Sequence, residues 1–308
     1  MKKISLLVLA FMSSGLIYSQ QLPMLTQFMD NAYVVNPAFA GMEDYYQVRT
    51  SIRNQFVGIN DFPTSTILSI YGKKDDKVGL GGLVFNDEIG PTSRTGAAVS
   101  YTYHFKASKK VNLALALSGG FTQFSINKTD WDVENPNDQL VQGDVIVESV
   151  PDATFGFNLY SERWCLGVSI PQLLTSKLNL LDNNFANNLS GEQTGTLSRH
   201  VYVIGSYRIS AGKKIDIQPS VLIKSVSPTP SQVDIGVKII YDKNIWIGAD
   251  YRTNGDLGAL FGYSIGDRYL IGYSYDLLNA DLADQASGSH EFMFAIKFRT
   301  IKNEKNIK

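Results

Sequence analysis

Three histidines, His104, His200 and His290, are the residues best suited to catalysis, and they lie in separate segments of the chain. Metal sites need His, Cys and carboxylates at short spacings, and no such cluster surrounds them. No nucleophile elbow, in which Gly-x-Ser-x-Gly joins a strand to a helix, is evident either. We therefore predict that the histidines are interfacial or lumenal polar residues, and that the protein is a non-enzyme without metal or cofactor. A lipid-processing enzyme that pairs a Ser with a His on adjacent strands is the alternative.

A second set of polar residues, in which cationic and acidic side chains are mixed, recurs on one face of the predicted strands. Charges facing lipid would be strongly unfavourable, so this face is expected to line a polar lumen. The mixed signs favour a lumen braced by ion pairs, with a selective ion pore as the alternative. The predicted lumenal charge network comprises Arg163, Arg208, Lys238, Arg252, Arg268, Asp152, Asp234, Asp250 and Asp276.

Strict alternation predicts the strands that carry these charges. From Leu257 to Leu277, apolar and aromatic residues alternate with Gly, Ser, Asp and Arg, so successive side chains leave opposite faces. A two-residue turn, Asn254-Gly255, precedes this stretch. The same contrast recurs from Tyr46 onward in about fourteen segments of about ten residues, which is long enough to cross an outer membrane at a tilt. The predicted fold class is all-β: a transmembrane antiparallel β-barrel of about 14 strands with a short N-terminal lead segment.

The lengths of the connections give an independent indication, because an even-stranded barrel with periplasmic termini has its odd-numbered connections at the cell surface. Predicted even-numbered connections, such as Lys73–Lys77 and Gly266-Asp267, are short. The odd-numbered ones are longer, apart from Asn254-Gly255, and comprise Phe56–Pro63, Asn86–Thr92, Asn127–Val150, Pro171–Leu197, Ser225–Ser231 and Leu278–Gly288. Long and short connections therefore sort to opposite ends, and both termini are expected in the periplasm.

Two of these predicted surface loops carry candidate partner-binding residues. Asn127–Val150 is acidic and contains an exposed-loop Trp, whereas Pro171–Leu197 is rich in apolar residues. Apolar residues in a surface loop either cover the mouth of the barrel or form a docking site, and the sequence leaves both open. The candidate partner-binding residues are Trp131, Asp132, Leu174, Leu178, Leu181 and Phe185.

The N-terminus predicts export. Met1-Lys2-Lys3 precedes the apolar stretch Ile4–Ile17 and small exit residues, which is the pattern of a signal peptide at residues 1–19; a retained anchor is the alternative. Cys165 is the only cysteine, so there is neither a lipobox nor a disulfide framework. With a net charge of -1 over 308 residues, nothing indicates binding to nucleic acid.

The mature chain is expected to have three parts. Residues 20–45 form the lead, whose apolar residues have loosely helical spacing, and we expect it to act as a plug or to pack against the barrel. A flexible periplasmic arm is the alternative for this segment. Residues 46–300 form the outer-membrane β-barrel in contact with lipid, and residues 301–308 form a basic periplasmic tail.

Four motifs follow one another along the chain. They are Asn36–Gly41, Gly79–Asp87 with Gly90–Gly96, Leu166–Pro171 and Gly288–Met293. In this order they resemble the PorP/SprF family of type IX secretion system outer-membrane proteins, over nearly all of the mature chain. There are two departures: Phe56 stands where the family often has Trp, and the basic tail Arg299–Lys308 extends beyond the last predicted strand.

The resemblance implies a non-enzymatic outer-membrane barrel of the type IX secretion and gliding machinery. Members of that family assist export or surface anchoring of a secreted protein, often an adhesin, by binding its C-terminal domain. The implied partners are therefore the C-terminal domain of a secreted surface protein and other type IX secretion components. An outer-membrane channel for small solutes or hydrophobic molecules, suggested by the lumenal charges and the strand number, is the alternative function.

Overall fold

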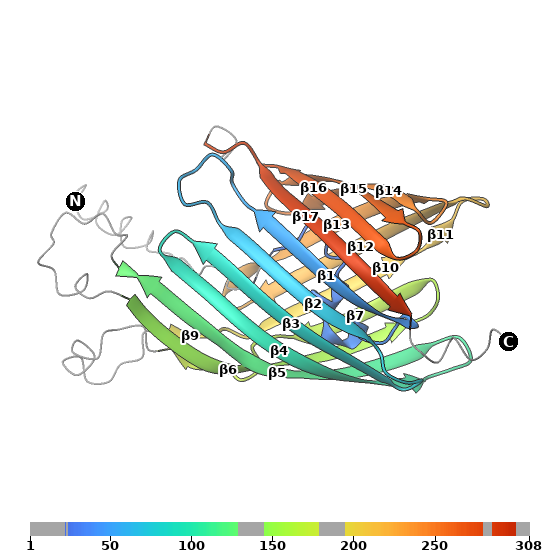
Figure 1. The fold of residues 1–308 in the computed structure, drawn as a ribbon, viewed down its shortest axis with the longest axis horizontal. Coiled ribbons are helices and arrows are strands. Elements are labelled where there is room, and N and C mark those ends of the chain that lie inside the picture. The colour runs from blue at the N-terminus through green and yellow to red at the C-terminus, as the bar shows by residue number, and fades with distance from the viewer. Residues whose placement is uncertain (1–21, 23, 129–144, 179–194, 280–284, 300–308) are drawn as a thin grey trace, which may run out of the picture.

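Fourteen antiparallel strands close into a barrel in the computed structural model of the chain (Figure 1). The structure describes residues 22, 24–128, 145–178, 195–279 and 285–299. Strands β1 and β17 pair with each other, and β10 pairs with both β7 and β12, which closes the sheet. Strands β10 and β11 are two parts of one wall strand interrupted at Arg208, since both pair with β12. The predicted fold class is therefore confirmed.

The strands of the wall differ in length around the barrel. They are β1 (Tyr45–Asn54), β2 (Thr64–Lys73), β3 (Val78–Ile89), β4 (Thr92–Lys106), β5 (Asn112–Asn127), β6 (Val145–Tyr160), β7 (Trp164–Ile170), β10 (His200–Tyr207), β11 (Ile209–Ser210), β12 (Ile215–Val226), β13 (Thr229–Tyr241), β14 (Ile245–Arg252), β15 (Leu257–Ile265), β16 (Tyr269–Leu277) and β17 (Ser289–Arg299). A separate two-stranded sheet consists of β8 (Lys177–Leu178) and β9 (Gly195–Thr196). No helix in the described part of the chain is long and apolar enough to cross a membrane.

The two faces of the wall differ in chemistry, as the alternation predicts. On β4 and β5, Val99 and Leu117 are 72% and 59% exposed on the outer face. Their neighbours Ser100 and Ser118 point the other way and are buried. Hydrocarbon solvates the apolar outer face, and a one-residue slip in register would turn the polar interior into the lipid. The alternation therefore fixes the register of the strands.

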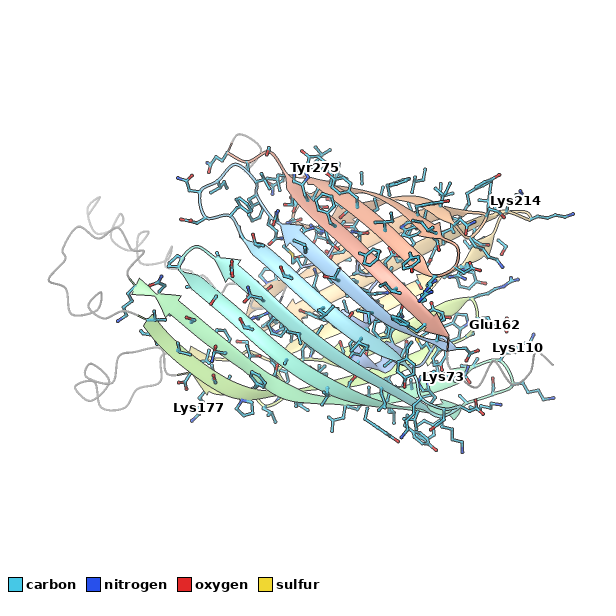
Figure 2. The ribbon with its side chains drawn as sticks, viewed as in Figure 1. Lys73, Lys110, Glu162, Lys177, Lys214 and Tyr275 are labelled. Carbon is cyan, nitrogen blue, oxygen red and sulfur yellow. The ribbon has the colours of Figure 1, made fainter. Side chains whose placement is uncertain are left out.

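The connections differ at the two ends of the barrel. Every connection of more than five residues joins strand ends at the same end of the barrel, the long-connection end. These connections are residues 55–63, 128–144, 171–199 and 278–288. The other end, the short-turn end, has connections such as 107–111 and 266–268. In Figure 2 the labelled Lys110, Lys214 and Glu162 lie at the short-turn end. Tyr45 pairs with Arg299, so the barrel begins and ends there too.

Three connections at the long-connection end differ in length from the prediction: two are shorter and one is longer. Strands β3 and β4 extend until only residues 90–91 join them, and only residues 227–228 join β12 and β13. The predicted loops Asn86–Thr92 and Ser225–Ser231 are therefore mostly strand, because polar residues continue the ladder beyond the apolar band. The turn predicted at Asn254-Gly255 is a four-residue connection, 253–256, in which Gly255 has a φ of 98°.

Candidate functional site

The described part of the lead, residues 22 and 24–44, lies inside the barrel and contacts strands on several sides of it (Figure 1). Its regular structure is brief, consisting of α2 (Ala32–Val35) and the 3-10 helix η1 (Pro37–Phe39). Thr26 bonds to residues of β16 and β17, Tyr33 to β4, and Asn36 to β6 and β7. The lead therefore crosses the lumen and is fixed to the wall on both sides.

A buried cluster of charged groups, the anchor cluster, holds the beginning of the lead. The backbone N–H of Thr26 donates to Glu291 Oε2 at 2.7 Å, and its hydroxyl donates to Asp276 Oδ2 at 2.8 Å. Arg53 Nη1 donates to the same hydroxyl oxygen at 2.8 Å, and Arg252 Nη2 donates to it as well. Both guanidinium groups also pair with Asp276. One threonine of the lead thus joins β1, β14, β16 and β17.

Burial makes the anchor cluster a strong positional constraint. Arg53, Arg252, Asp276 and Glu291 are all 2% exposed or less. Removing one partner of a buried ion pair costs about 3–5 kcal/mol, because the remaining charge is left desolvated and unpaired. If the lead left the lumen, both guanidinium groups would lose their shared hydroxyl acceptor. The wall and the lead therefore depend on each other.

The anchor cluster continues along the wall through further ion pairs. Arg252 Nε lies 3.6 Å from Asp250 Oδ1 and 3.9 Å from Asp234 Oδ2. Lys224 Nζ lies 2.9 Å from the same oxygen of Asp234. Opposite charges on neighbouring strands therefore neutralise one another inside the barrel, where single charges would be strongly unfavourable.

Asn36 fixes the second half of the lead. Its side-chain oxygen accepts from the N–H of Ala38 at 2.9 Å and so caps η1, which begins with Pro37. Its side-chain amide donates to the carbonyl oxygen of Phe157 at 2.9 Å and to that of Val168 at 3.3 Å. The same side chain therefore shapes the lead and attaches it to β6 and β7.

Two glycines of β3 allow the lead to lie against the wall. A Cβ atom at Gly79 would overlap the carbonyl group of Ala40, and one at Gly81 would overlap the ring of Tyr33. Any larger residue would have to displace the lead, since glycine alone permits such a close approach.

Tyr33 is the aromatic contact of the lead with this part of the wall. Its ring stacks on Tyr71 with the ring centroids 4.4 Å apart, and its hydroxyl shares a hydrogen bond of 2.7 Å with Ser100 Oγ. Burial raises the pKa of Tyr33 to about 12, so the hydroxyl stays protonated at physiological pH. The contact therefore persists as a neutral hydrogen bond.

The structure brings four members of the predicted lumenal charge network together. These are Arg252, Asp234, Asp250 and Asp276, all in the anchor cluster and its extension. Lys238 lies apart from them and pairs with Asp30 of the lead at 2.7 Å. Asp152 is half-buried and accepts from the N–H of Ala153 at 2.7 Å.

The other three predicted members do not join this network. Arg163 and Arg268 lie in short turns, and Arg208 lies at the interruption between β10 and β11. All three are exposed, and the guanidinium of Arg268 lies 5.5 Å from the ring centroid of Tyr269. Alternation places them on the inward face, but at the end of the barrel water solvates them and no partner is required.

Three residues of the anchor cluster are absent from the predicted network: Thr26, Arg53 and Glu291. The alternation contains the signal for two of them. Glu291 shares its face with buried Met293, and Arg53 shares its face with buried Arg49. Thr26 gives no such signal, because the lead has no alternation and its contacts come from strands about 250 residues away.

The candidate partner-binding residues are only partly described. Leu174 is 50% exposed at the long-connection end. Leu178 is buried and packs with Val150 and Leu197, so it is not an exposed contact residue. The remaining candidates lie outside the described residues; they are Trp131, Asp132, Leu181 and Phe185.

The three histidines lie on separate strands and have structural partners. His104 bonds to the carbonyl oxygen of Ala40 in the lead at 2.8 Å, and His290 bonds to the hydroxyl of Tyr273 at 2.8 Å. His200 bonds to a backbone carbonyl oxygen at 2.8 Å. Within the described ranges, no group of three or more His, Cys, Asp and Glu residues is placed to hold a metal ion.

A Gly-x-Ser-x-Gly spacing does occur at Gly262–Gly266, in the stretch where alternation predicts a strand. In serine hydrolases this serine lies on a sharp turn between a strand and a helix. Here Ser264 lies within β15, and its N–H donates to the carbonyl oxygen of Asn244 at 2.6 Å. The spacing therefore forms no nucleophile elbow.

Among the cavities that adjoin the described part of the lead, two are relevant to ligand binding. The apolar cavity, of about 110 Å³, lies between the lead and strands β2–β6, β10 and β12, and its lining includes Leu25, Phe28 and Phe85. The polar cavity, of about 470 Å³, lies toward the short-turn end, and its lining includes Arg163 and Arg208. Residues of the lead line both cavities.

Residues 17–296 match the family model described as type IX secretion system membrane protein PorP/SprF. The chain belongs to the PorP/SprF family. This PorP/SprF protein is thus an integral outer-membrane β-barrel of the type IX secretion system, as the four motifs predict. No curated protein sequence matches the chain.

The barrel of this PorP/SprF protein is similar to two toluene transporters. TbuX of Ralstonia pickettii has 10% sequence identity and a TM-score of 0.52, over 87% of this chain and 93% of TbuX. TodX of Pseudomonas putida has 8% identity and a TM-score of 0.52, over 88% of this chain and 94% of TodX. Such low identities show a shared fold alone. The family and these neighbours are secretion or transport barrels, not enzymes.

The anchoring role of Arg53 predicts a large effect on stability. Arg53→Met should lower the free energy of unfolding by about 3 kcal/mol or more, because Asp276 and Glu291 would remain buried with fewer partners. Urea unfolding of the purified barrel measures this difference. Arg163→Met, at an exposed position, is the matched control and should change the value by about 0.5 kcal/mol at most. Equal effects of the two substitutions would contradict the anchoring role.

The close approach at β3 predicts opposite outcomes for two adjacent glycines. Gly81→Ala should destabilise the protein by about 1–3 kcal/mol, because its Cβ overlaps the ring of Tyr33. Gly82→Ala should be tolerated, since its Cβ would meet only Ile70 Cγ2 at 3.4 Å and a carbonyl oxygen at 3.9 Å. Unfolding midpoints and protease sensitivity of the lead report the difference. A tolerated Gly81→Ala with an intact lead would be inconsistent with this packing.

Proposed function

We propose that the protein assists export or surface anchoring of a secreted protein, an adhesin, by binding the C-terminal domain of that protein at the long-connection end of the barrel. The observation that carries this proposal is the occupied lumen. The lead crosses the barrel and is bonded to strands on both sides. A barrel whose interior is filled offers its ends to large partners, and membership of the PorP/SprF family supports a partner from the secretion pathway.

The orientation in the membrane is part of the proposal. In outer-membrane barrels, short turns face the periplasm and longer loops face the outside. The start of β1 and the end of β17 lie at the short-turn end, which favours periplasmic termini. Other type IX secretion components in the periplasm would then meet the short-turn end, while cargo would meet the long-connection end.

A channel for small solutes or hydrophobic molecules is the second candidate. The two cavities beside the lead favour it, because together they occupy part of the space between the ends of the barrel. The toluene transporters share the fold, but at 8–10% identity this supports only the architecture. A channel requires the lead to move, which the anchor cluster opposes.

The cargo-binding role predicts that the two longest connections are needed for surface display. Replacing residues 129–144 or 179–194 by a short Gly-Ser linker should reduce cargo on intact cells at least about tenfold, because the docking residues are removed. Antibody labelling of whole cells measures the displayed cargo, and heat-modifiable electrophoresis checks that the barrel is folded.

The matched control alters the opposite end of the barrel. Lys109→Ser combined with Lys110→Ser changes the exposed connection between β4 and β5 and should leave display unchanged. Normal display by both loop replacements would overturn the assignment of cargo binding to these connections.

A further inference from the structure

The apolar cavity contains a cationic group that its surroundings do not satisfy. Most of its lining is apolar, and the lead and the wall both contribute to it. Arg94, at the beginning of β4, is among the lining residues although it is only 7% exposed. An arginine buried against apolar side chains needs acceptors for its donors, because each unpaired buried donor is unfavourable.

The partners of Arg94 use only part of its guanidinium group. Nη2 donates to Asp87 Oδ2 at 2.7 Å, and the guanidinium carbon lies 4.9 Å from the ring centroid of Phe85. Nε and Nη1 are buried and have no hydrogen-bond partner. A guanidinium group presents five N–H donors in a planar fork that matches a carboxylate. The Nε–H and Nη1–H donors of Arg94 point to different edges of the guanidinium plane, so an added oxyanion can accept from either one but not from both at once.

The other polar groups around the cavity have mixed character. Lys224 lines the cavity as a second cation, and it pairs with Asp234 at 2.9 Å. Asp152 is the acidic residue of the lining. Gln172, which is 2% exposed and lines the cavity, has an unpaired side-chain oxygen. Unpaired donors and an unpaired acceptor thus border the same apolar space.

The volume of the cavity limits the apolar part of a ligand. A buried apolar cavity of about 150 Å³ accommodates benzene. A cavity of about 110 Å³ therefore takes a smaller group, comparable to a branched aliphatic side chain or the last few carbons of an acyl chain. Pro171 and Gln172, which follow β7, place this site near the long-connection end.

We propose that the apolar cavity binds a carboxylate joined to a short apolar group, with the carboxylate accepting from one of the unpaired N–H donors of Arg94 and the apolar group between the lead and β3–β5. Two sources share this chemistry: the C-terminal residue of a peptide and a fatty acid. The site stands on its own geometry and does not depend on the cargo-binding proposal. A peptide ligand would connect this site with the cargo-binding proposal.

Binding of small soluble probes to the full-length barrel in lipid nanodiscs tests this site. The probes are N-acetyl-leucine and hexanoate, with N-acetyl-leucinamide and hexanamide as analogues without the carboxylate. Saturation-transfer NMR titrations give the dissociation constants. We expect at least one acid to bind, and its amide to bind at least about tenfold more weakly, because charge-assisted hydrogen bonds are lost. Preference for N-acetyl-leucine indicates a peptide source, and preference for hexanoate indicates an acyl source; both support the site.

Substitutions locate the binding at Arg94. Arg94→Gln should weaken binding of the acid at least about tenfold, and Ala98→Leu should block it by filling the cavity. Arg208→Gln, at an exposed arginine of the short-turn end, is the matched control and should bind as the wild type does. If Arg94→Gln fails to fold, binding of the acid to Arg94→Lys and the comparison of acid with amide on the wild type test the proposal instead. Absence of binding to the wild type, equal binding of acid and amide, or unchanged binding after substitution of Arg94 would overturn the proposal.

Discussion

The hydroxyl group of Thr26, shared by the guanidinium groups of Arg53 and Arg252, is the contact on which the rest of the structure depends. A polar lumen allows charges on the inward face of the strands, but buried charges need partners. Carboxylates of the wall are some of these partners. The hydroxyl group of Thr26 in the lead is the partner that both guanidinium groups share. The barrel interior and the lead therefore form one polar unit, and the apolar outer face remains for the lipid.

The motifs that carry the family resemblance meet in this unit. Asn36–Gly41 is the part of the lead that turns against the wall. Gly79–Asp87 supplies the glycines that let it approach, and Leu166–Pro171 supplies Ser169, whose hydroxyl donates to the lead carbonyl of Val35 at 2.6 Å. Gly288–Met293 supplies Glu291 of the anchor cluster. Motifs far apart in the sequence are thus explained by one shared contact surface, which suits a barrel that presents docking surfaces rather than an open passage.

Much of the fold follows from the sequence, because alternation reports directly which side of a strand faces lipid. The outward position of Val99 and the inward position of Asp276 could both be predicted from it. Alternation does not report depth, so it groups exposed Arg268 at the end of the barrel with buried Arg252. The lead has no alternation, so its position cannot be predicted in this way. The position of Thr26 depends on long-range contacts that no local pattern encodes. Alternation also places the ends of β3 and β4 too early, because polar residues extend these strands beyond the apolar band.

Single-channel recording in planar bilayers tests most directly whether the lead closes the lumen. The wild-type protein should insert without steady conductance steps, because the lead is bonded across the lumen. A variant in which residues 24–41 are replaced by a short Gly-Ser linker should conduct steadily, which shows that insertion itself is detected. Stable open-channel conductance of the wild type, equal to that of the variant, would contradict the account.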